Sequence, residues 1–505
     1  QKTVLRKEHY MRTSIWPLAL AGALALASSF SPALAARTDI NLAMQLEPPS
    51  LDPTTGGAAA AIRSVTYDNI FEGLTRIDRD GAVKPLLAKS WDISEDGLEY
   101  TFHLQDGVVF HDGNPLTAAD VKYSLDTARG EDSVNAQKQL FAKIASVDVI
   151  DDLTVKVTLS GPQGDFLYNM GWGDAVIVSE RNAATNGTEP VGTGPYRMLE
   201  WVKGDHVTLA ANPSYWGAAP EIETAVIKFI SDPTAAVASV LSGDVDYYGG
   251  FPAPEVLDQI KADPRFQVIV GATNGETVLA MNNGKAPLDN IKVRAAIAHA
   301  LDRSAIIDGA QFGYGTPIGS FFPPTDPAYV DLTGISNFDP ELSKKLLAEA
   351  GVSDLTLSLK LPPASYARAA GPIIQQELAN VGIKVEITNV EWADWLQNVF
   401  TNKDYDLTIV SHVEPNDYGS FAKEGYYFNY NSEAFNAVIA EIGNTTDPQK
   451  QIELKQQAQK ILAEDFAAGF LFEYPYITIA AEGLKGMWEN QPVPANPIAE
   501  LSWSM

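Results

Sequence analysis

The side chains that could carry out a reaction are few in this chain and lie far apart. There is no cysteine, no G-x-S-x-G nucleophile motif and no H-E-x-x-H zinc motif. His111 stands beside Asp112, but no third ligand is spaced nearby, which favours a histidine satisfied within a turn over a metal ligand. The six histidines are His9, His103, His111, His206, His299 and His412. We therefore expect no catalytic residue, no metal site and no cofactor.

Polar and aromatic side chains are instead concentrated between Trp392 and Tyr430. A site for a small solute needs a concave, mostly apolar surface with a few fixed polar groups. The loop after the predicted strand 405–410 leaves the carboxyl end of a sheet, where α/β folds commonly hold ligands. The candidate ligand-binding residues of this segment are Trp392, Ser411, His412, Glu414, Asp417, Tyr418 and Tyr426. Tyr247 and Asn274 are two further candidates from earlier in the chain.

Each aromatic candidate also has a structural interpretation. Trp392 could equally line a pocket or fill a core, whereas core is favoured for Trp395. Tyr426 and Tyr427 are consecutive, so one of them should face a cleft and the other the interior. Tyr247 is equally compatible with a cleft wall and with the core.

The stretch 98–125 predicts a hairpin followed by a helix. Residues 100, 102 and 104 are apolar and alternate with polar residues, as in a half-buried strand. Two Asp-Gly pairs, at 106–107 and 112–113, supply tight turns. Thr117 stands three residues before Asp120, which is typical of a capping box at the start of a helix.

Within this stretch, residues 107–121 read G-V-V-F-H-D-G-N-P-L-T-A-A-D-V and resemble the signature of the family 5 extracellular solute-binding proteins. These are the dipeptide-, oligopeptide- and nickel-binding components of ABC importers. Further stretches resemble the same family: P-L-L-A-K-S-W at 85–91, G-T-G-P-Y at 192–196 and N-P-S-Y-W-G at 212–217. The two glycines of G-T-G-P-Y and its proline also predict a bend that backbone can approach closely.

The resemblance implies an α/β fold of two lobes, the class II type of periplasmic-binding-protein fold, with an extra subdomain inserted in lobe I. We expect lobe I over 36–270 with the inserted subdomain at about 75–190, lobe II over 271–470, and a return to lobe I over 471–505. Strands that alternate with helices in the second half independently predict an α/β lobe. Two extended crossovers, near 271–282 and 470–480, should join the lobes and let them close on a ligand.

Residues 1–35 have the pattern of a leader and a signal peptide. Arg12 precedes an apolar run at 15–30, and small residues at 33–35 stand at the spacing of a cleavage site. The run is shorter than the ~20 residues that span a membrane. Without cysteine there is no lipid anchor, so we expect a free periplasmic protein. A formal net charge of -28 argues against nucleic acid as a partner.

One departure from the family pattern bears on the ligand. In peptide-binding relatives, an Asp three residues before an acidic-Pro pair holds the amino group of the peptide. The pair here is Glu414-Pro415, and Ser411 stands where that Asp would be. A buried ammonium needs a carboxylate. Either Glu414 or Asp417 takes over this role, or the ligand is not an ordinary peptide.

The predicted function is therefore capture of a small, peptide-like organic solute by a monomer and its delivery to a membrane-embedded ABC permease. A non-peptide solute, such as an opine, a modified amino acid or a glycoside, is the alternative that Ser411 suggests. A secreted hydrolase is the rival from another class. Turnover of a peptide or ester would support the hydrolase, whereas stoichiometric binding without turnover would support capture.

Overall fold

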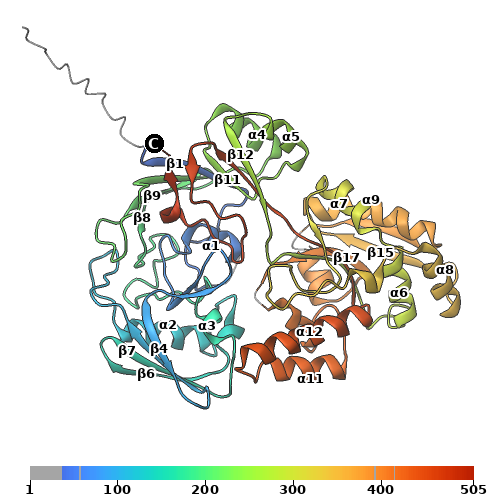
Figure 1. Cartoon of the computed structure of the whole chain (residues 1–505), viewed down its shortest axis with the longest axis horizontal. Helices are drawn as coiled ribbons and strands as arrows, with labels where there is room; N and C mark the ends of the chain where they lie inside the picture. Colours follow the sequence, from blue (N-terminus) through green and yellow to red (C-terminus); the bar gives the residue numbers. More distant parts are fainter. Residues whose placement is uncertain (1–36, 56–58, 392–393, 415, 505) are drawn as a thin grey trace, which may run out of the picture. The chain divides into compact units, whose positions relative to one another are not determined.

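The computed structural model describes residues 37–55, 59–391, 394–414 and 416–504 (Figure 1). The predicted leader and signal peptide lie outside the described residues. Three sheets, of seven, six and four strands, organise this part of the chain. None of its helices is long and apolar enough to cross a membrane.

Strand β1 is central to the seven-stranded sheet, where it runs parallel to both neighbours. Its alternating residues Ile40 and Leu42 are buried in the core on one side of this sheet. In spatial order the strands are β12 (Phe266–Gly271), β19 (Tyr476–Ala481), β11 (Tyr247–Gly249), β1 (Asp39–Met44), β10 (Thr224–Phe229), β9 (His206–Ala211) and β8 (Tyr196–Val202).

Among the helices around this sheet, α4 begins and ends at residues that favour such positions. The carboxylate of Asp232 accepts a hydrogen bond from the Ala235 amide at 2.8 Å and caps α4, which ends at Gly243 with a φ of 80°. The helices are α1 (Ala59–Thr66), α4 (Pro233–Ser242) and α5 (Leu257–Lys261).

The antiparallel four-stranded sheet contains the predicted hairpin. Tyr100, Phe102 and Leu104 are all buried, as their period-two pattern indicates. The Thr117 amide donates to the Asp120 carboxylate at 3.0 Å, which forms half of the predicted capping box. The elements are β4 (Ala88–Ile93), β5 (Glu99–Leu104), β7 (Thr154–Leu159), β6 (Ile144–Asp151) and the helix α2 (Ala118–Arg129).

The six-stranded sheet is buried on both faces. Leu279 of β13 joins a core with α6, α7, α8 and α9, whereas Val278 joins a second core with α11 and α12. In spatial order the strands are β14 (Thr316–Pro317), β18 (Ala468–Glu473), β13 (Glu276–Met281), β17 (Leu407–His412), β15 (Thr356–Leu361) and β16 (Lys384–Asn389). The helices are α6 (Ile291–Ala300), α7 (Arg303–Gln311), α8 (Pro340–Glu349), α9 (Ser365–Asn380), α11 (Glu433–Ile442) and α12 (Pro448–Glu464).

The chain passes between the two large sheets twice, at 272–275 and at 474–475. From its sequence, the apolar run 470–480 predicts a single strand. In the structure it belongs to two strands, β18 and β19, which lie in different sheets. Pro475 lies at the break because proline has no amide hydrogen to donate to a ladder. The division into lobes at 270 and 470 stays a prediction, since sheet membership alone does not define rigid bodies.

Shorter elements complete the fold. The C-terminal segment returns to the seven-stranded sheet, where the Trp503 indole donates to the carbonyl of Asp39 at 2.9 Å. The short strands and helix are β2 (Thr75–Ile77), β3 (Val83–Pro85), β20 (Leu484–Lys485), β21 (Ser502–Trp503) and α3 (Phe166–Asn169). The 3₁₀ helices are η1 (Lys138–Phe141), η2 (Pro254–Val256), η3 (Thr333–Ser336), η5 (Asp417–Ala422) and η6 (Ile498–Glu500), and η4 (Trp395–Thr401) is a π-helix.

Backbone atoms of other segments lie close to the bend predicted at G-T-G-P-Y. The Gly194 amide donates to the carbonyl of Ile70 at 3.0 Å, and the Gly192 carbonyl accepts from the His111 amide at 2.9 Å. A Cβ atom at Gly192 would lie 1.9 Å from the Ile70 oxygen, so only glycine fits.

We therefore expect Gly192→Ala to lower the free energy of unfolding by about 1–3 kcal/mol, because backbone must move to admit the methyl group. Gly161→Ala is the matched control, since a Cβ there meets nothing within 4 Å. Chemical denaturation of both variants measures the difference. Equal stability of the two would refute the steric explanation.

Candidate functional site

The six-stranded sheet places three ionisable side chains in one row at its edge. In the register of β18, β13 and β17, Glu473, Glu276 and His412 are direct neighbours. Residues opposite each other on adjacent strands point to the same face of a sheet. The edge consists of the carboxyl ends of β17 and β18 and the beginning of β13. The predicted loop after residue 410 begins here, although the strand extends two residues further than predicted.

Ser411 points to the opposite face from His412, because successive side chains alternate along a strand. It pairs with Thr277 of β13, and its amide donates to the Tyr366 hydroxyl at 2.9 Å. The hydroxyl groups of Ser411 and Thr277 are buried and have no hydrogen-bond partner among the described residues. Ser411 therefore stands on the side of the sheet that α9 covers.

A cavity of about 410 Å³ lies beside Glu276, and we call it the loop cavity. Four of the predicted residues line it: Asn274, Glu414, Asp417 and Tyr418. The lining also includes Asp165, Tyr168, Glu276, Asp326 and Lys455, from segments far apart in the sequence. Acidic side chains in this lining thus outnumber the basic ones, Arg79 and Lys455.

Glu276 and Asp417 are buried carboxyl groups of this cavity that have no cationic partner among the described residues. The Oε2 atom of Glu276 has no hydrogen-bond partner among the described residues. Burial, reinforced by the charge of Asp417, raises the pKa of Glu276 well above its usual range. Burial, reinforced by Glu414, raises the pKa of Asp417 in the same way. Within the described chain, neither carboxyl forms an ion pair with lysine or arginine.

Glu414 differs from Asp417 because it contacts a cation. Its Oε2 atom lies 3.6 Å from Nη2 of Arg63 and accepts a hydrogen bond from the side-chain amide of Gln137. The Arg63 guanidinium also pairs with Asp174 at 2.5 Å. The backbone amide of Glu414 donates to Oδ2 of Asp417 at 2.9 Å, which fixes the start of the loop.

Several other charged groups of the loop cavity have partners. The Arg79 guanidinium lies 2.6 Å from the Glu500 carboxylate. The Lys455 ammonium lies 3.1 Å from the Asp326 carboxylate. The carboxylate of Asp165 accepts a hydrogen bond from the side-chain amide of Asn416 at 2.9 Å. Since Asp165 caps α3 beside the four-stranded sheet and Asn416 follows β17, this bond joins the two sides of the cavity.

His412 and the tyrosines that follow form an aromatic cluster behind the loop. Nε2 of His412 lies 2.8 Å from the Tyr427 hydroxyl. Burial lowers the pKa of His412 to about 4, so the ring is neutral at pH 7. Tyr427 is fully buried and Tyr426 half-buried, so Tyr427 is the one that faces the interior; that Tyr426 faces a cleft stays a prediction. His412 and Tyr426 do not line the loop cavity in the described part of the chain.

The remaining aromatic candidates lie elsewhere. Tyr247 is buried in the core beside the seven-stranded sheet, where its hydroxyl lies 3.4 Å from Oδ1 of Asn496. Of the two interpretations, cleft wall and core, its environment is that of the core. Trp395 is also buried, and its indole donates to the Thr408 hydroxyl at 2.9 Å. Trp392 lies outside the described residues.

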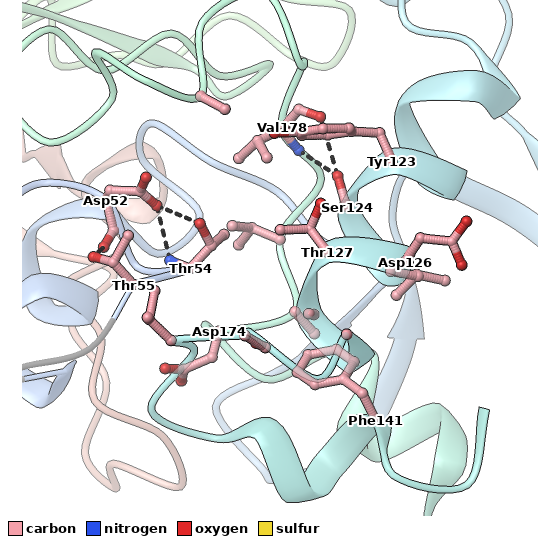
Figure 2. A pocket seen from close by; sticks show the side chains of 18 of the residues that line it. Asp52, Thr54, Thr55, Tyr123, Ser124, Asp126, Thr127, Phe141, Asp174 and Val178 are labelled. Atoms are coloured by element: carbon pink, nitrogen blue, oxygen red, sulfur yellow. Dashed lines mark hydrogen bonds between the residues drawn. The ribbon is translucent and has the colours of Figure 1, made fainter. Parts of the chain in front are cut away.

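A second cavity, of about 570 Å³, is bounded by α2 and by the loop after β1, and we call it the α2 cavity (Figure 2). Asp52 is turned to its own loop there and accepts two hydrogen bonds from Thr54. Asp174 lines this cavity and pairs with Arg63. Arg63 in turn faces Glu414, which lines the loop cavity. These three charged side chains therefore stand between the two cavities.

Sequence reasoning missed several residues of the site. Glu276 could have been recognised as a site residue from the sequence, because it is a charged residue at the start of the mostly apolar run 276–281. Arg63, Gln137 and Asp165 carry no local signal, since only the tertiary fold brings them to the loop. In the described chain, no three histidine or acidic side chains converge in a way that could hold a metal ion.

Residues 82–436 match the model of the bacterial extracellular solute-binding proteins, family 5, middle region. The chain belongs to this family. Its proteins are non-enzymatic solute-binding components of ABC transporters, which confirms the predicted family and the prediction that this protein is not an enzyme. The α/β fold is confirmed as well, because the solved structures that it matches cover almost the whole chain.

Three relatives illustrate the range of solutes in the family. The glutathione-binding protein GsiB of Salmonella paratyphi A is 29% identical over 92% of this chain and 95% of its own. The Helicobacter pylori protein DppA, solved with the peptide STSA, has a TM-score of 0.79 at 25% identity over 92% of this chain and 98% of its own. AgaA of A. tumefaciens, solved with agropinic acid, has a TM-score of 0.79 at 26% identity over 92% and 99%.

The raised pKa of Glu276 predicts a pH-dependent cost to stability. Between the ordinary carboxyl pKa and the raised value, the folded protein binds a proton that the unfolded chain does not, so the free energy of unfolding falls as pH rises. Glu276→Gln removes this titration. It should stabilise the unliganded protein by about 0.5–2 kcal/mol at pH 8 and have little effect at pH 4.

Thermal unfolding at both pH values measures this effect. Glu453→Gln, at an exposed position of α12, is the control and should change stability at neither pH. A loss of stability in Glu276→Gln at both pH values would mean that its carboxylate has a structural partner.

Proposed function

We propose that this protein is the periplasmic solute-binding component of an ABC importer for small, peptide-like solutes that carry a protonated amine. The solute binds in the loop cavity, the lobes close over it, and the permease receives it. The observation that carries the proposal is a pair of buried carboxyl groups, Glu276 and Asp417, that line one cavity and form no ion pair with a lysine or arginine among the described residues.

The proposal follows from the cost of burying carboxylates. Two such groups close together raise each other's pKa, and they favour either a proton or a cation between them. An ammonium supplies three donors and a positive charge, so it can satisfy the orphaned Oε2 atom of Glu276 as well as Asp417. Tyr168 and Tyr418 offer aromatic surface for the apolar part of the solute.

Of the two acids that the sequence left open as the anchor, the contacts favour Asp417. Glu414 is already engaged by Arg63 and Gln137, and a carboxylate that has a cationic partner attracts a second cation less strongly. Ser411 has no part in this arrangement, because its hydroxyl is on the other face of the sheet.

Relatives support the class of solute without deciding between its members. Glutathione and the peptide STSA are the solutes named for two of them, and both carry a free amine. Agropinic acid, named for the third, keeps an opine as the alternative to a peptide. A neutral glycoside would leave Glu276 and Asp417 without a charge partner.

Calorimetric titration with dialanine, glutathione and their N-acetylated forms tests the proposal. A free-amine form should bind, and its N-acetylated form should bind more weakly by about 2–5 kcal/mol, because acetylation removes the ammonium. Asp417→Asn and Glu276→Gln should remove most of this difference, whereas the exposed control Glu453→Gln should preserve it.

The pH dependence provides an independent check. Since the carboxyl groups must lose their protons to accept an ammonium, affinity for the free amine should rise between pH 5 and pH 8. Equal affinity for free and acetylated forms in the unaltered protein would exclude ammonium anchoring.

A further inference from the structure

The contact between Arg63 and Glu414 has the chemistry of a carboxylate-binding site. The Arg63 side chain comes from α1 and is 1% exposed, and Gln137 precedes η1. Nη2 of Arg63 and Nε2 of Gln137 both face the same oxygen, Oε2 of Glu414. Two donors from separate segments thus converge on one carboxylate that reaches them from the loop after β17.

Both donors are held in place by other parts of the chain. Asp174 binds Nη1 of Arg63 at 2.5 Å, and the guanidinium lies 5.2 Å from the ring centre of Trp172. A Cβ atom at Gly173 would come within 2.5 Å of the Arg63 side chain, so the backbone there is closely fitted to it. The Gln137 amide oxygen accepts from Gln139, which directs its NH₂ group outward. Such preorganised donors recognise a carboxylate without reordering.

Glu414 fills this site incompletely. At 3.6 Å its Oε2 atom lies beyond hydrogen-bond distance from Nη2 of Arg63, and Nη2 and Nε remain buried without a partner in the described residues. An unsatisfied buried donor is costly, whereas guanidinium and carboxylate can form two parallel hydrogen bonds. A carboxylate that the loop does not constrain could approach more closely than Glu414 does.

We propose that Arg63 and Gln137 form a carboxylate-binding site, which Glu414 occupies in the unliganded protein and which takes the carboxylate of the bound solute. The inference rests on the proposed solute-binding role of the loop cavity and narrows its ligand to a molecule with both an ammonium and a carboxylate. Glu414 also lines that cavity, so its departure opens the space between the two anchors.

Charge balance indicates replacement rather than addition. Among the described residues, Asp174 and Glu414 share a single cation, Arg63, and a third carboxylate beside it would lack a counter-charge. The solute carboxylate therefore competes with Glu414. Because the Glu414 amide holds Asp417, displacement of Glu414 also couples the carboxylate site to the ammonium site.

Acetate titration of the full-length mature protein tests the site without knowledge of the natural solute. Glu414→Ala removes the internal competitor and leaves room for acetate at Arg63 and Gln137. Acetate should bind this variant saturably and about tenfold or more tighter than the unaltered protein, where the tethered carboxylate competes at millimolar effective concentration. Thermal shift and NMR titration at constant ionic strength, with chloride as the replaced anion, measure the binding.

The second substitution Gln137→Ala, made in the Glu414→Ala background, should weaken acetate binding again while the protein stays folded. Glu453→Ala, which removes an exposed carboxylate, should behave like the unaltered protein. The proposal is overturned if acetate does not saturate Glu414→Ala, or if loss of Gln137 leaves the acetate affinity unchanged. Acetate has no amine, so either result is independent of the ammonium test at Glu276 and Asp417.

Discussion

The burial of two carboxyl groups that have no cationic partner among the described residues is the constraint on which the site depends. Glu276 and Asp417 line one cavity, and burial opposes the charged form of each. In the unliganded protein this cost is reduced by proton uptake. A cationic ligand relieves it more effectively, because it supplies both the charge and the hydrogen bonds that the carboxylates lack. The proposed selectivity for an amine would thus be a consequence of where the fold places two acids.

Sheet register and loop anchoring produce this placement together. The antiparallel pairing of β13 with β17 sets Glu276 beside His412, at the point where the loop begins. The loop is then held from both sides, because Asn416 binds Asp165 and Glu414 reaches Arg63 and Gln137. The solute would meet groups from segments that are hundreds of residues apart, as a protein that closes on its ligand requires.

Local patterns predicted several of the elements but only part of the site. The burial of Tyr100, Phe102 and Leu104, the cap of α4 at Asp232 and the close approach at Gly192 follow from rules that act over a few residues. The loop with Glu414 and Asp417 was predicted for the same reason, since ligands gather at the carboxyl ends of strands.

The rest of the site depended on tertiary structure. Ser411 stands at the family's anchor position, yet β17 extends to His412 and directs the serine to the other face. Glu276 is hidden in an apolar strand, and Arg63 becomes a candidate only when Glu414 is seen beside it. The contact between Arg63 and Glu414 has no signature in the sequence, because it joins segments whose separation along the chain is large.

The most direct test is native mass spectrometry of the solute that co-purifies with the protein from its own periplasm, followed by fragmentation of the released molecule. A solute held by Glu276 and Asp417 should contain a basic amine, and occupation of the Arg63 site adds a carboxylate to that requirement. An amine without a carboxylate would contradict the role of Arg63 alone. A neutral sugar or glycoside with no basic nitrogen would contradict ammonium recognition itself.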